Sequence, residues 1–189
     1  MYYTTLKQLR ENGACSDRYD YLVEHGKIES DDTKVTLKKI LKVNGLDDAI
    51  WALRAVEHNE IERDARLFAC ACARRVVERY PEHKDVLLAT IKVSERYAIG
   101  KATEEELESA ERSAVRLAAR SDELSAAWLV ARSEARSTAW SSARSTAWLS
   151  AWSTARSSAG SSEGSSAWLS AWLAERKQQE KIFIKYFCK

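Results

Sequence analysis

Residues 135–158 read ARSTAWSSARSTAWLSAWSTARSS, in which alanine recurs at every fourth position and is always followed by arginine or tryptophan. Four residues turn a straight helix through about 400°, so each repeat advances the alanine stripe by roughly 40° around the helix. A straight partner could therefore follow that stripe for about three repeats only. The repeat therefore requires either that two helices wrap around each other in a right-handed supercoil or that the stripe contacts several partner helices one after another.

The small alanine side chains let another helix backbone approach closely, while the arginine and tryptophan stripe lies about 100° to one side and flanks the contact. We expect helices that pack against other helices, from the same chain or from identical copies. Because the apolar content of the repeat is concentrated in tryptophan, an isolated arm would expose a large aromatic area. The sequence therefore predicts a homo-oligomer in which these arms pair.

The four-residue rhythm extends beyond this stretch with one interruption. It starts at residues 127–128, weakens near Gly160 and Gly164, and resumes at residues 167–168. Serine-rich sequence is typical of flexible linkers, but disordered segments lack tryptophan, and six of the seven tryptophans lie in this part of the chain. We therefore expect a long helix that breaks or kinks near the two glycines, giving a helical hairpin or arms that oligomerise.

Short amphipathic helices are expected before the repeat, each with a start signal, a stop signal or both. Gly13, Gly26 and Gly45 each stand where such a helix should stop, and the polar residues 27–34 are expected to form a loop. The chain has a single proline and six glycines, which favours helices throughout. The sequence predicts an all-α fold.

Two features place the helices of the central part. Phe68, Cys72 and Val76 recur at helical spacing within the strongest expected core helix, and Thr103 and Glu106 form a T-x-x-E capping box before another helix. The expected organisation is a domain of short amphipathic helices over residues 1–120, followed by repeat helices with an apolar C-terminal tail over residues 121–189.

Charge and hydropathy argue against several classes of function. The formal net charge is +2, so no overall basic field favours nucleic acid or a membrane surface. No uncharged apolar run approaches the roughly 20 residues that a membrane span needs. The first residues, MYYTTLKQLREN, lack the apolar segment of a secretory signal, so we expect a cytoplasmic protein.

The cysteines are expected to be reduced and structural. Cys70 and Cys72 form C-x-C, and in a helix their side chains would point about 200° apart, which argues against a shared metal. We expect small buried hydrophobic side chains at both positions. The other two are Cys15 and Cys188. The three histidines stand near expected helix ends, as surface or capping residues: His25, His58 and His83.

Reactive constellations are not found. The sequence has no G-x-S-x-G, H-E-x-x-H, P-loop or G-x-G-x-x-G motif. Residues 104–106 are three glutamates at a helix start, where carboxylates complement the helix dipole. Arg74 and Arg75 could bind an anion, although a solvated helix face is favoured. We predict a protein that is not an enzyme, with no cofactor and no metal.

Alternating arginine and tryptophan also have a chemical interpretation. Tryptophan stacks on bases, and arginine binds phosphate through two parallel hydrogen bonds or stacks in its own right. In the competing interpretation, each arginine stacks on the tryptophan four residues away and only covers it from solvent. The candidate ligand-binding residues are Arg132, Arg136, Trp140, Arg144, Trp148, Trp152, Arg156, Trp168 and Trp172.

The order of several segments resembles a known family. An early NGAC with Cys15, the run RLFACACARR at residues 66–75, and a stretch over residues 91–110 that includes RYAIGKATEEELESA precede the alanine-rich repeat. Together they resemble a family of alanine-rich proteins of bacteria and phages, some of which are described as immunity proteins of polymorphic toxin systems. In this chain serine and threonine stand where the family more often has alanine, and Gly160 and Gly164 interrupt the repeat.

The resemblance implies a small neutralising protein that works by binding, in the cytoplasm of the bacterial host if a phage encodes it. Our leading hypothesis is a phage counter-defence protein that sequesters a small anionic, nucleotide-like signal in an arginine- and tryptophan-lined groove. The alternative is an immunity-type protein that blocks a protein toxin or a defence effector. A purely structural oligomerisation module stays open, and nucleic-acid binding is the least favoured.

Overall fold

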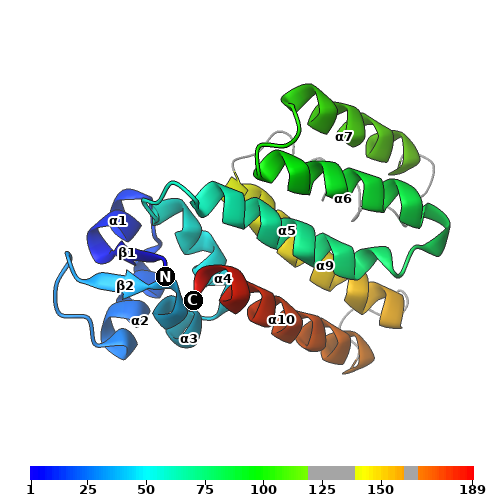
Figure 1. Cartoon of the computed structure of the whole chain (residues 1–189). Coiled ribbons are helices and arrows are strands. Elements are labelled where there is room, and N and C mark those ends of the chain that lie inside the picture. The colour runs from blue at the N-terminus through cyan, green and yellow to red at the C-terminus, as the bar shows by residue number, and fades with distance from the viewer. Residues whose placement is uncertain (119–138, 160–165) are drawn as a thin grey trace. The chain divides into compact units, whose positions relative to one another are not determined.

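The computed structural model describes residues 1–118, 139–159 and 166–189, and it is mostly helical (Figure 1). The helical character predicted from the sequence is confirmed for this part, with the addition of two short strands. None of the helices in the described ranges is long and apolar enough to cross a membrane.

The chain divides into two compact units. The first comprises residues 1–61 together with residues 183–189, and the second comprises residues 62–182. The boundary expected between residues 120 and 121 falls outside the described residues and stays a prediction.

The first unit is a small sheet surrounded by short helices. Its elements are β1 (Tyr3–Thr5), α1 (Leu6–Glu11), α2 (Ser16–Gly26), β2 (Lys34–Thr36), α3 (Leu37–Asn44), α4 (Leu46–Trp51) and a 3-10 turn at Ala52–Ala55. β1 and β2 pair antiparallel, with Thr4 opposite Val35. Thr4 is fully buried, and its hydroxyl donates to the carbonyl of Ala55 over 2.6 Å.

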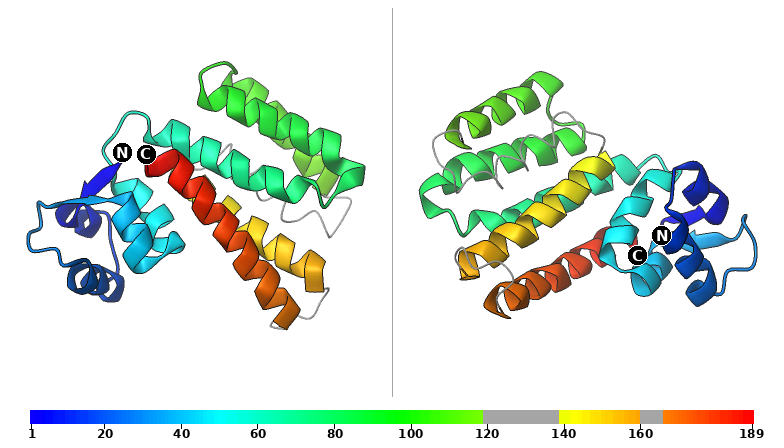
Figure 2. Two further views of the ribbon diagram at one scale, coloured as in Figure 1. Left: turned by 60° about the horizontal axis from the view of Figure 1, so that its bottom comes forward. Right: turned by 180° about the vertical axis from the view of Figure 1, so that it is seen from behind.

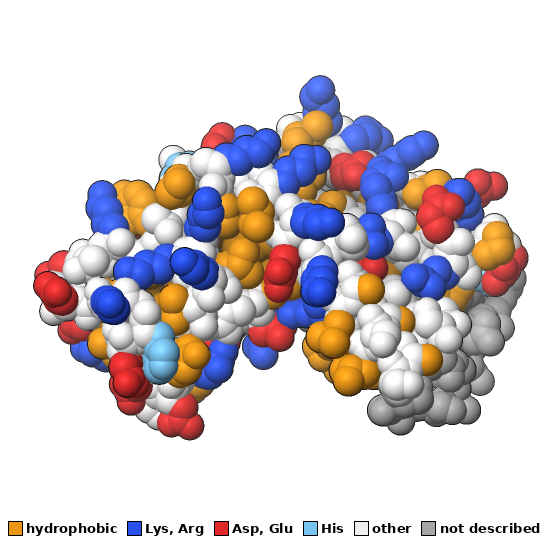
Figure 3. Space-filling view, turned by 90° about the horizontal axis from the view of Figure 1, so that it is seen from below, with side chains coloured by type: hydrophobic (Ala, Val, Ile, Leu, Met, Phe, Trp, Pro, Cys, Tyr) orange, Lys and Arg blue, Asp and Glu red, His pale blue; other side chains and the backbone are white. Residues whose placement is uncertain are grey.

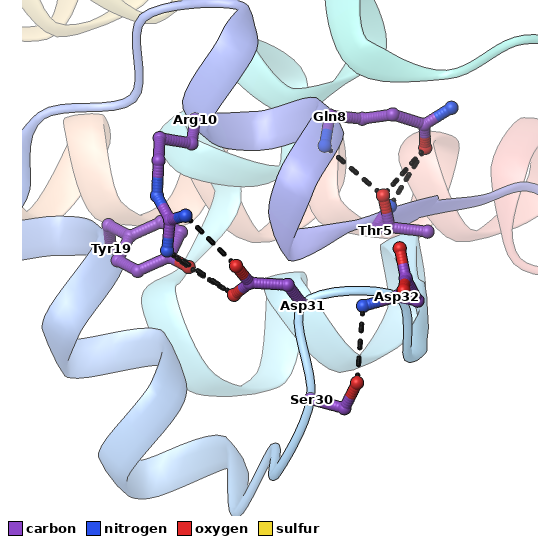
Figure 4. Close-up of polar contacts among 7 residues, drawn as sticks. All are labelled: Thr5, Gln8, Arg10, Tyr19, Ser30, Asp31 and Asp32. Atoms are coloured by element: carbon purple, nitrogen blue, oxygen red, sulfur yellow. Dashed lines mark hydrogen bonds and ion pairs between the residues drawn. The ribbon is translucent and has the colours of Figure 1, made fainter.

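The expected loop at residues 27–34 is confirmed except at its last residue, where β2 begins. This loop is held against α1 by an exposed polar cluster (Figure 4). Arg10 donates two hydrogen bonds to the Asp31 carboxylate, of 2.9 and 3.2 Å, and a third to the Tyr19 hydroxyl at 2.6 Å. The cluster joins α1, α2 and the loop through side chains that a sequence pattern does not pair.

The second unit is a set of helices packed side by side. They are α5 (Ile61–Val77), α6 (Lys84–Ala98), α7 (Glu104–Ala118), α9 (Ala139–Ala159) and α10 (Ser166–Phe187), with a 3-10 turn at Pro81–His83. α6 lies between α5 and α7, and α9 lies alongside α5 (Figures 1 and 2). α9 and α10 lie side by side and run in opposite directions, as both views in Figure 2 show. Residues 183–187 of α10 belong to the first unit.

The core of the second unit begins on the face of α5 that the sequence predicted. Phe68 and Cys72 are fully buried, and Val76 is nearly so. Val76 also belongs to an apolar cluster with Tyr80 and the α6 residues Leu87 and Ile91. The other buried members of this cluster are Cys70, Ala73 and Val77. A stripe of apolar residues at helical spacing thus places α5 at the centre of this unit.

Helix ends follow the sequence signals with one correction. Gly13 and Gly45 have φ angles of 81° and 88°, a region that favours glycine. Gly26, in contrast, is the last residue of α2, and Lys27 adopts the left-handed conformation with φ of 50°. The glycine at position 26 instead suits a close contact, because a Cβ there would lie 3.2 Å from Ile28 Cδ1.

The T-x-x-E capping box is confirmed at the start of α7. The Thr103 amide donates to the Glu106 carboxylate over 2.8 Å, and the Glu106 amide donates to the Thr103 hydroxyl over 3.2 Å. Two amides at the helix start that have no acceptor within the helix are thus satisfied.

Replacing Thr103 with alanine removes one of these hydrogen bonds and should weaken the first turn of α7 by about 1 kcal/mol. We expect the Glu106 amide to exchange its hydrogen about five times faster, measured by NMR or mass spectrometry. Thr103→Ser keeps the hydroxyl and serves as the control, with exchange close to that of the original chain. Equal acceleration in both variants would contradict a capping role for the hydroxyl.

Candidate binding surface on helices α9 and α10

The alanine stripe of α9 lies in its buried face. Four successive repeat alanines of this helix have no solvent exposure: Ala143, Ala147, Ala151 and Ala155. Small hydroxyl-bearing residues complete the face, since Thr146 and Ser150 are also buried. Between Ala143 and Ala155 the buried face of α9 therefore carries no side chain larger than threonine. Such a face allows neighbouring helices to come close.

Gln179 of α10 fixes the contact between α9 and α10. Its side chain is fully buried, and its carboxamide nitrogen donates to the Ala147 carbonyl and to the Ser150 hydroxyl, both over 2.7 Å. Its carboxamide oxygen accepts a hydrogen bond of 2.9 Å from Arg176. A carbonyl inside a helix already accepts a hydrogen bond from its own helix. It can accept a second bond, from a side chain of another helix, only where the side chains beside it are short. Alanine in the repeat provides that access.

Two further contacts join α5 and the residues just after it to α10 and α9. Arg75 donates two hydrogen bonds to the Glu175 carboxylate, of 2.7 and 3.0 Å, and Glu175 is 3% exposed. Just beyond α5, the Tyr80 hydroxyl lies 2.7 Å from the Ser153 hydroxyl of α9. A buried carboxylate without a partner destabilises a fold, so removing Arg75 alone would leave the Glu175 carboxylate buried and unpaired.

The environment of α5 explains the C-x-C pair and the arginines that follow it. Cys70 and Cys72 are buried, as predicted, and burial raises the pKa of the Cys72 thiol, with a further contribution from Glu175. Arg74 donates two hydrogen bonds to Glu95 of α6, of 2.8 and 2.7 Å. Protein carboxylates therefore occupy the two guanidinium groups, and a free ligand anion would have to displace them.

The candidate ligand-binding residues divide into several groups. Arg132 and Arg136 lie outside the described residues, as does the side chain of Trp140. Arg144 and Arg156 are exposed, and Trp148 is 50% exposed. The rest are partly buried: Trp152, Trp168 and Trp172.

Three of the candidate tryptophans come together from two helices. The ring centroids of Trp148 and Trp172 are 6.0 Å apart with the planes at 72°, and those of Trp168 and Trp172 are 5.3 Å apart in a parallel stack. Both geometries are favoured for aromatic pairs. The cluster presents the half-exposed indole of Trp148 on α9, one helical turn after Arg144.

Trp152 and Arg156 form a different arrangement. The Arg156 guanidinium carbon lies 5.1 Å from the centre of the Trp152 ring, within the range of a cation–π contact. This is the intramolecular stacking at i and i+4 that the competing interpretation describes. At this pair, the arginine covers the indole of its own helix.

Glu175 and Gln179 were not among the candidate residues, although the sequence carries a signal for them. Residues 167, 171, 175, 179, 183 and 187 continue the four-residue spacing of the repeat beyond its last alanine. Glu175, Gln179, Phe183 and Phe187 are all buried. At this spacing α10 is buried from Glu175 onward, whereas Ala167 is exposed and Ala171 is partly buried, so the buried stripe begins where alanine gives way to larger residues.

Hydrophobic side chains also gather on one face of the second unit, as the space-filling view shows (Figure 3). Leu169 and Leu173 of α10 are 50% and 51% exposed, comparable to Trp148. The described part of α9 contains two arginines and no carboxylate. This part of the surface combines exposed apolar groups on both helices with two exposed arginines on α9.

The histidines lie at helix ends, as predicted. His25 stacks on Tyr21 at the end of α2 with centroids 4.0 Å apart, and His58 accepts a hydrogen bond from the Glu60 amide before α5. His83 precedes α6. Within the described ranges, no three histidine, cysteine or acidic side chains gather as a metal site.

Comparison of the chain with models of protein families, with curated proteins and with solved structures finds no match in any of the three.

A larger side chain in the alanine stripe should force α9 away from its neighbours. We expect Ala151→Leu to lower the free energy of unfolding by about 1–3 kcal/mol, because overpacking a tight contact shifts side chains and backbone. Urea denaturation measures this change. Ser157→Leu places the same residue at an exposed position of α9 and should change stability by less than about 0.5 kcal/mol. Equal effects would contradict the burial of the stripe.

Cysteine alkylation tests the environment of α5 independently. Burial raises the pKa values of Cys72 and Cys188 and thereby disfavours the reactive thiolate, whereas Cys15 is exposed. At pH 8, iodoacetamide should add one label per chain to the folded protein, at Cys15, and four labels after denaturation. Rapid native labelling of Cys72 would show that α5 is not packed as described. Mass spectrometry of tryptic peptides distinguishes these outcomes.

Proposed function

We propose that this chain is a non-catalytic binding protein that neutralises its target by sequestering it, and that the ligand is a small nucleotide-like anion. One observation carries the proposal. Trp148 is half exposed at the edge of a three-indole cluster and lies one helical turn from the exposed Arg144. An aromatic face beside a guanidinium offers complementary contacts to a base and to its phosphate.

The energetics favour Trp148 as the stacking platform. Stacking of a base on an aromatic side chain contributes about 1–3 kcal/mol. The indoles of Trp168 and Trp172 support Trp148 from α10, so the ring that receives the ligand is already held in place, and less entropy is lost on binding. Arg144 then supplies a charged, directional hydrogen-bond donor for a phosphate oxygen.

Local charge supports an anionic ligand although the chain as a whole is nearly neutral. The described part of α9 carries Arg144 and Arg156 without a carboxylate, and the Glu175 carboxylate of α10 is bound by Arg75. A phosphate near Arg144 would meet no repulsion from within α9. Arg156 already covers Trp152, so we assign the ligand contact to Arg144 and Trp148 and treat the second pair as structural support.

A protein target is the second candidate. Tryptophan and arginine are the residues most enriched at the energetic centres of protein interfaces, and Trp148 is half exposed in this surface. The resemblance to alanine-rich proteins described as immunity proteins agrees with neutralisation by binding in either case. The expected homo-oligomer would bring the surfaces of several copies into one assembly.

The test is titration of the purified protein with a panel of linear and cyclic mono- and dinucleotides, followed by tryptophan fluorescence and calorimetry. We expect one class of nucleotide to quench the fluorescence, and Trp148→Ala to weaken its binding at least tenfold, in line with the loss of one stacked base. Arg144→Gln should weaken binding of the same nucleotide, with the effect smaller at high salt.

Lys92→Gln, which removes a charge from an exposed residue of α6, is the matched control for Arg144→Gln and should bind as the original chain does. Circular dichroism verifies that all variants keep their helix content. Bound nucleotide released by heat should have an unchanged mass, because the protein sequesters and does not react. If no nucleotide binds, or if Trp148→Ala binds equally well, the nucleotide proposal is wrong and a protein target takes its place.

A further inference from the structure

Helix α9 repeats the pair of groups that Gln179 of α10 contacts. Gln179 donates to the carbonyl of Ala147 and to the hydroxyl of Ser150, three residues further along. The four-residue spacing places an alanine and, three residues later, a hydroxyl-bearing residue again on either side of this pair. Between residues 143 and 154, α9 therefore offers Gln179 three equivalent pairs of acceptors, of which the structure uses the middle one.

The two outer pairs are buried and unused. Ala143 and Ala151 have no solvent exposure. The hydroxyls of Thr146 and Thr154 are also buried, and neither has a hydrogen-bond partner within the described part of the chain. A buried hydroxyl without a partner destabilises a fold and therefore needs an explanation. Two such hydroxyls, one repeat to each side of the occupied pair, point to alternative positions of a single contact.

A shift of α9 by one repeat gives Gln179 the next pair. Four residues correspond to a translation of about 6 Å along the helix and a rotation of about 40°. When each residue takes the place of the one four positions before it, Gln179 meets the carbonyl of Ala151 and the hydroxyl of Thr154. The contact of Arg75 with Glu175 joins α5 to α10 without involving α9, so the shift leaves it intact.

The contact with Tyr80 selects the direction of the shift. The Tyr80 hydroxyl lies 2.7 Å from the Ser153 hydroxyl of α9. The shift described above replaces Ser153 with Ser157 and keeps a hydroxyl opposite Tyr80. A shift in the other direction would place Leu149 there and leave the buried Tyr80 without this partner. One direction alone preserves both polar contacts of α9.

We propose that α9 exchanges between two registers against α10, the observed one and one displaced by a single repeat. The displacement of one element past another by about one helical turn is a known kind of conformational switch. The repeat is imperfect at the partly buried Leu149, whose place Ser153 takes after the shift. The two registers therefore differ in apolar burial and are not equally populated.

The shift also changes the nucleotide site, and this step rests on the proposed function. In the observed register Trp148 lies against Trp172, and Arg144 is one turn before Trp148. In the shifted register Trp152 takes the place of Trp148, and Trp148 takes that of Arg144. A second indole then replaces the guanidinium beside the supported ring. A bound nucleotide should therefore hold α9 in the observed register.

Cysteine labelling distinguishes the two registers. Ser158 is exposed, and the shifted register carries it to the buried place of Thr154. Ser158→Cys is therefore the reporter, and mass spectrometry of tryptic peptides measures its rate of reaction with a maleimide. Ser150→Ala with Ser153→Ala removes the two hydroxyl partners that α9 offers in the observed register and keeps those of the shifted one.

We expect the reporter to react about fivefold more slowly in this double variant than in the chain with Ser158→Cys alone, because each lost hydroxyl contact shifts an equilibrium by about two- to tenfold. A loss of stability does not produce this result, since opening of the helix exposes the cysteine and speeds its reaction. Reaction at the same rate or faster in the double variant would overturn the proposal.

A quadruple variant is the matched control. Adding Thr154→Val and Ser157→Ala to the double variant also removes the hydroxyls that stabilise the shifted register. The reporter should then react at least as fast as in the chain with Ser158→Cys alone. Slow reaction that persists in the quadruple variant would overturn the proposal, because the protection would not depend on the hydroxyls of the shifted register.

The coupling to the nucleotide is tested separately. The labelling experiments contain no nucleotide, so the register shift stands or fails whether or not a nucleotide binds. A nucleotide that binds the original chain should restore fast labelling of the reporter when it saturates the double variant. Slow labelling in the presence of the bound nucleotide would overturn the coupling, whereas failure of every nucleotide to bind would contradict the proposed function alone.

Discussion

The hydrogen bond from the Gln179 carboxamide to the Ala147 carbonyl depends on the absence of a large side chain beside that carbonyl. It is fully buried, 2.7 Å long, and accompanied by an equally short bond to Ser150. The repeat alanines from Ala143 to Ala155 are likewise without solvent exposure. In a packed interior, removing side-chain volume at every fourth residue is what permits polar groups on a neighbouring helix to reach the backbone of α9. This contact joins α9 to α10 within the second unit.

The same contact decides which residues are left for binding. Once alanine and small hydroxyl-bearing residues fill the buried face of α9, the residue after each alanine lies at the edge of that face or beyond it. Arg144 and Arg156 are exposed, and Trp148 is half exposed. The repeat therefore has two effects in one helix. Its alanines allow close packing on the buried side, and the arginine or tryptophan after each alanine forms an aromatic and cationic edge on the outer side. The proposed ligand surface is a consequence of how the helix is packed.

Periodicity and local signals predicted the features of the structure that depend on residues close in sequence. The core face of α5, the capping box of Thr103 and Glu106, and the buried C-x-C all follow from spacing along one helix. The short pairing of β1 with β2 was missed, because three residues are too few to show an alternating pattern.

The missed parts of the candidate surface involve partners distant in sequence. The pair of Arg75 with Glu175 joins residues 100 positions apart, and the pair of Tyr80 with Ser153 joins residues 73 positions apart. Nothing in either local sequence distinguishes these side chains from a solvated arginine or a repeat serine. Glu175 could have been identified only by extending the four-residue spacing past the last alanine, where the change in composition conceals it.

The most direct test of this account is a cysteine accessibility scan of α9. Single cysteines are placed at positions 143–156 of a variant in which the four native cysteines are replaced by serine or alanine, and maleimide labelling rates are measured under native conditions. The account predicts slow labelling at the positions of Ala143, Ala147, Ala151 and Ala155, and fast labelling at those of Arg144, Trp148 and Arg156. Labelling at the four alanine positions as fast as at those of Arg144 and Arg156 would contradict it, because the alanines would then not form the buried face of the helix.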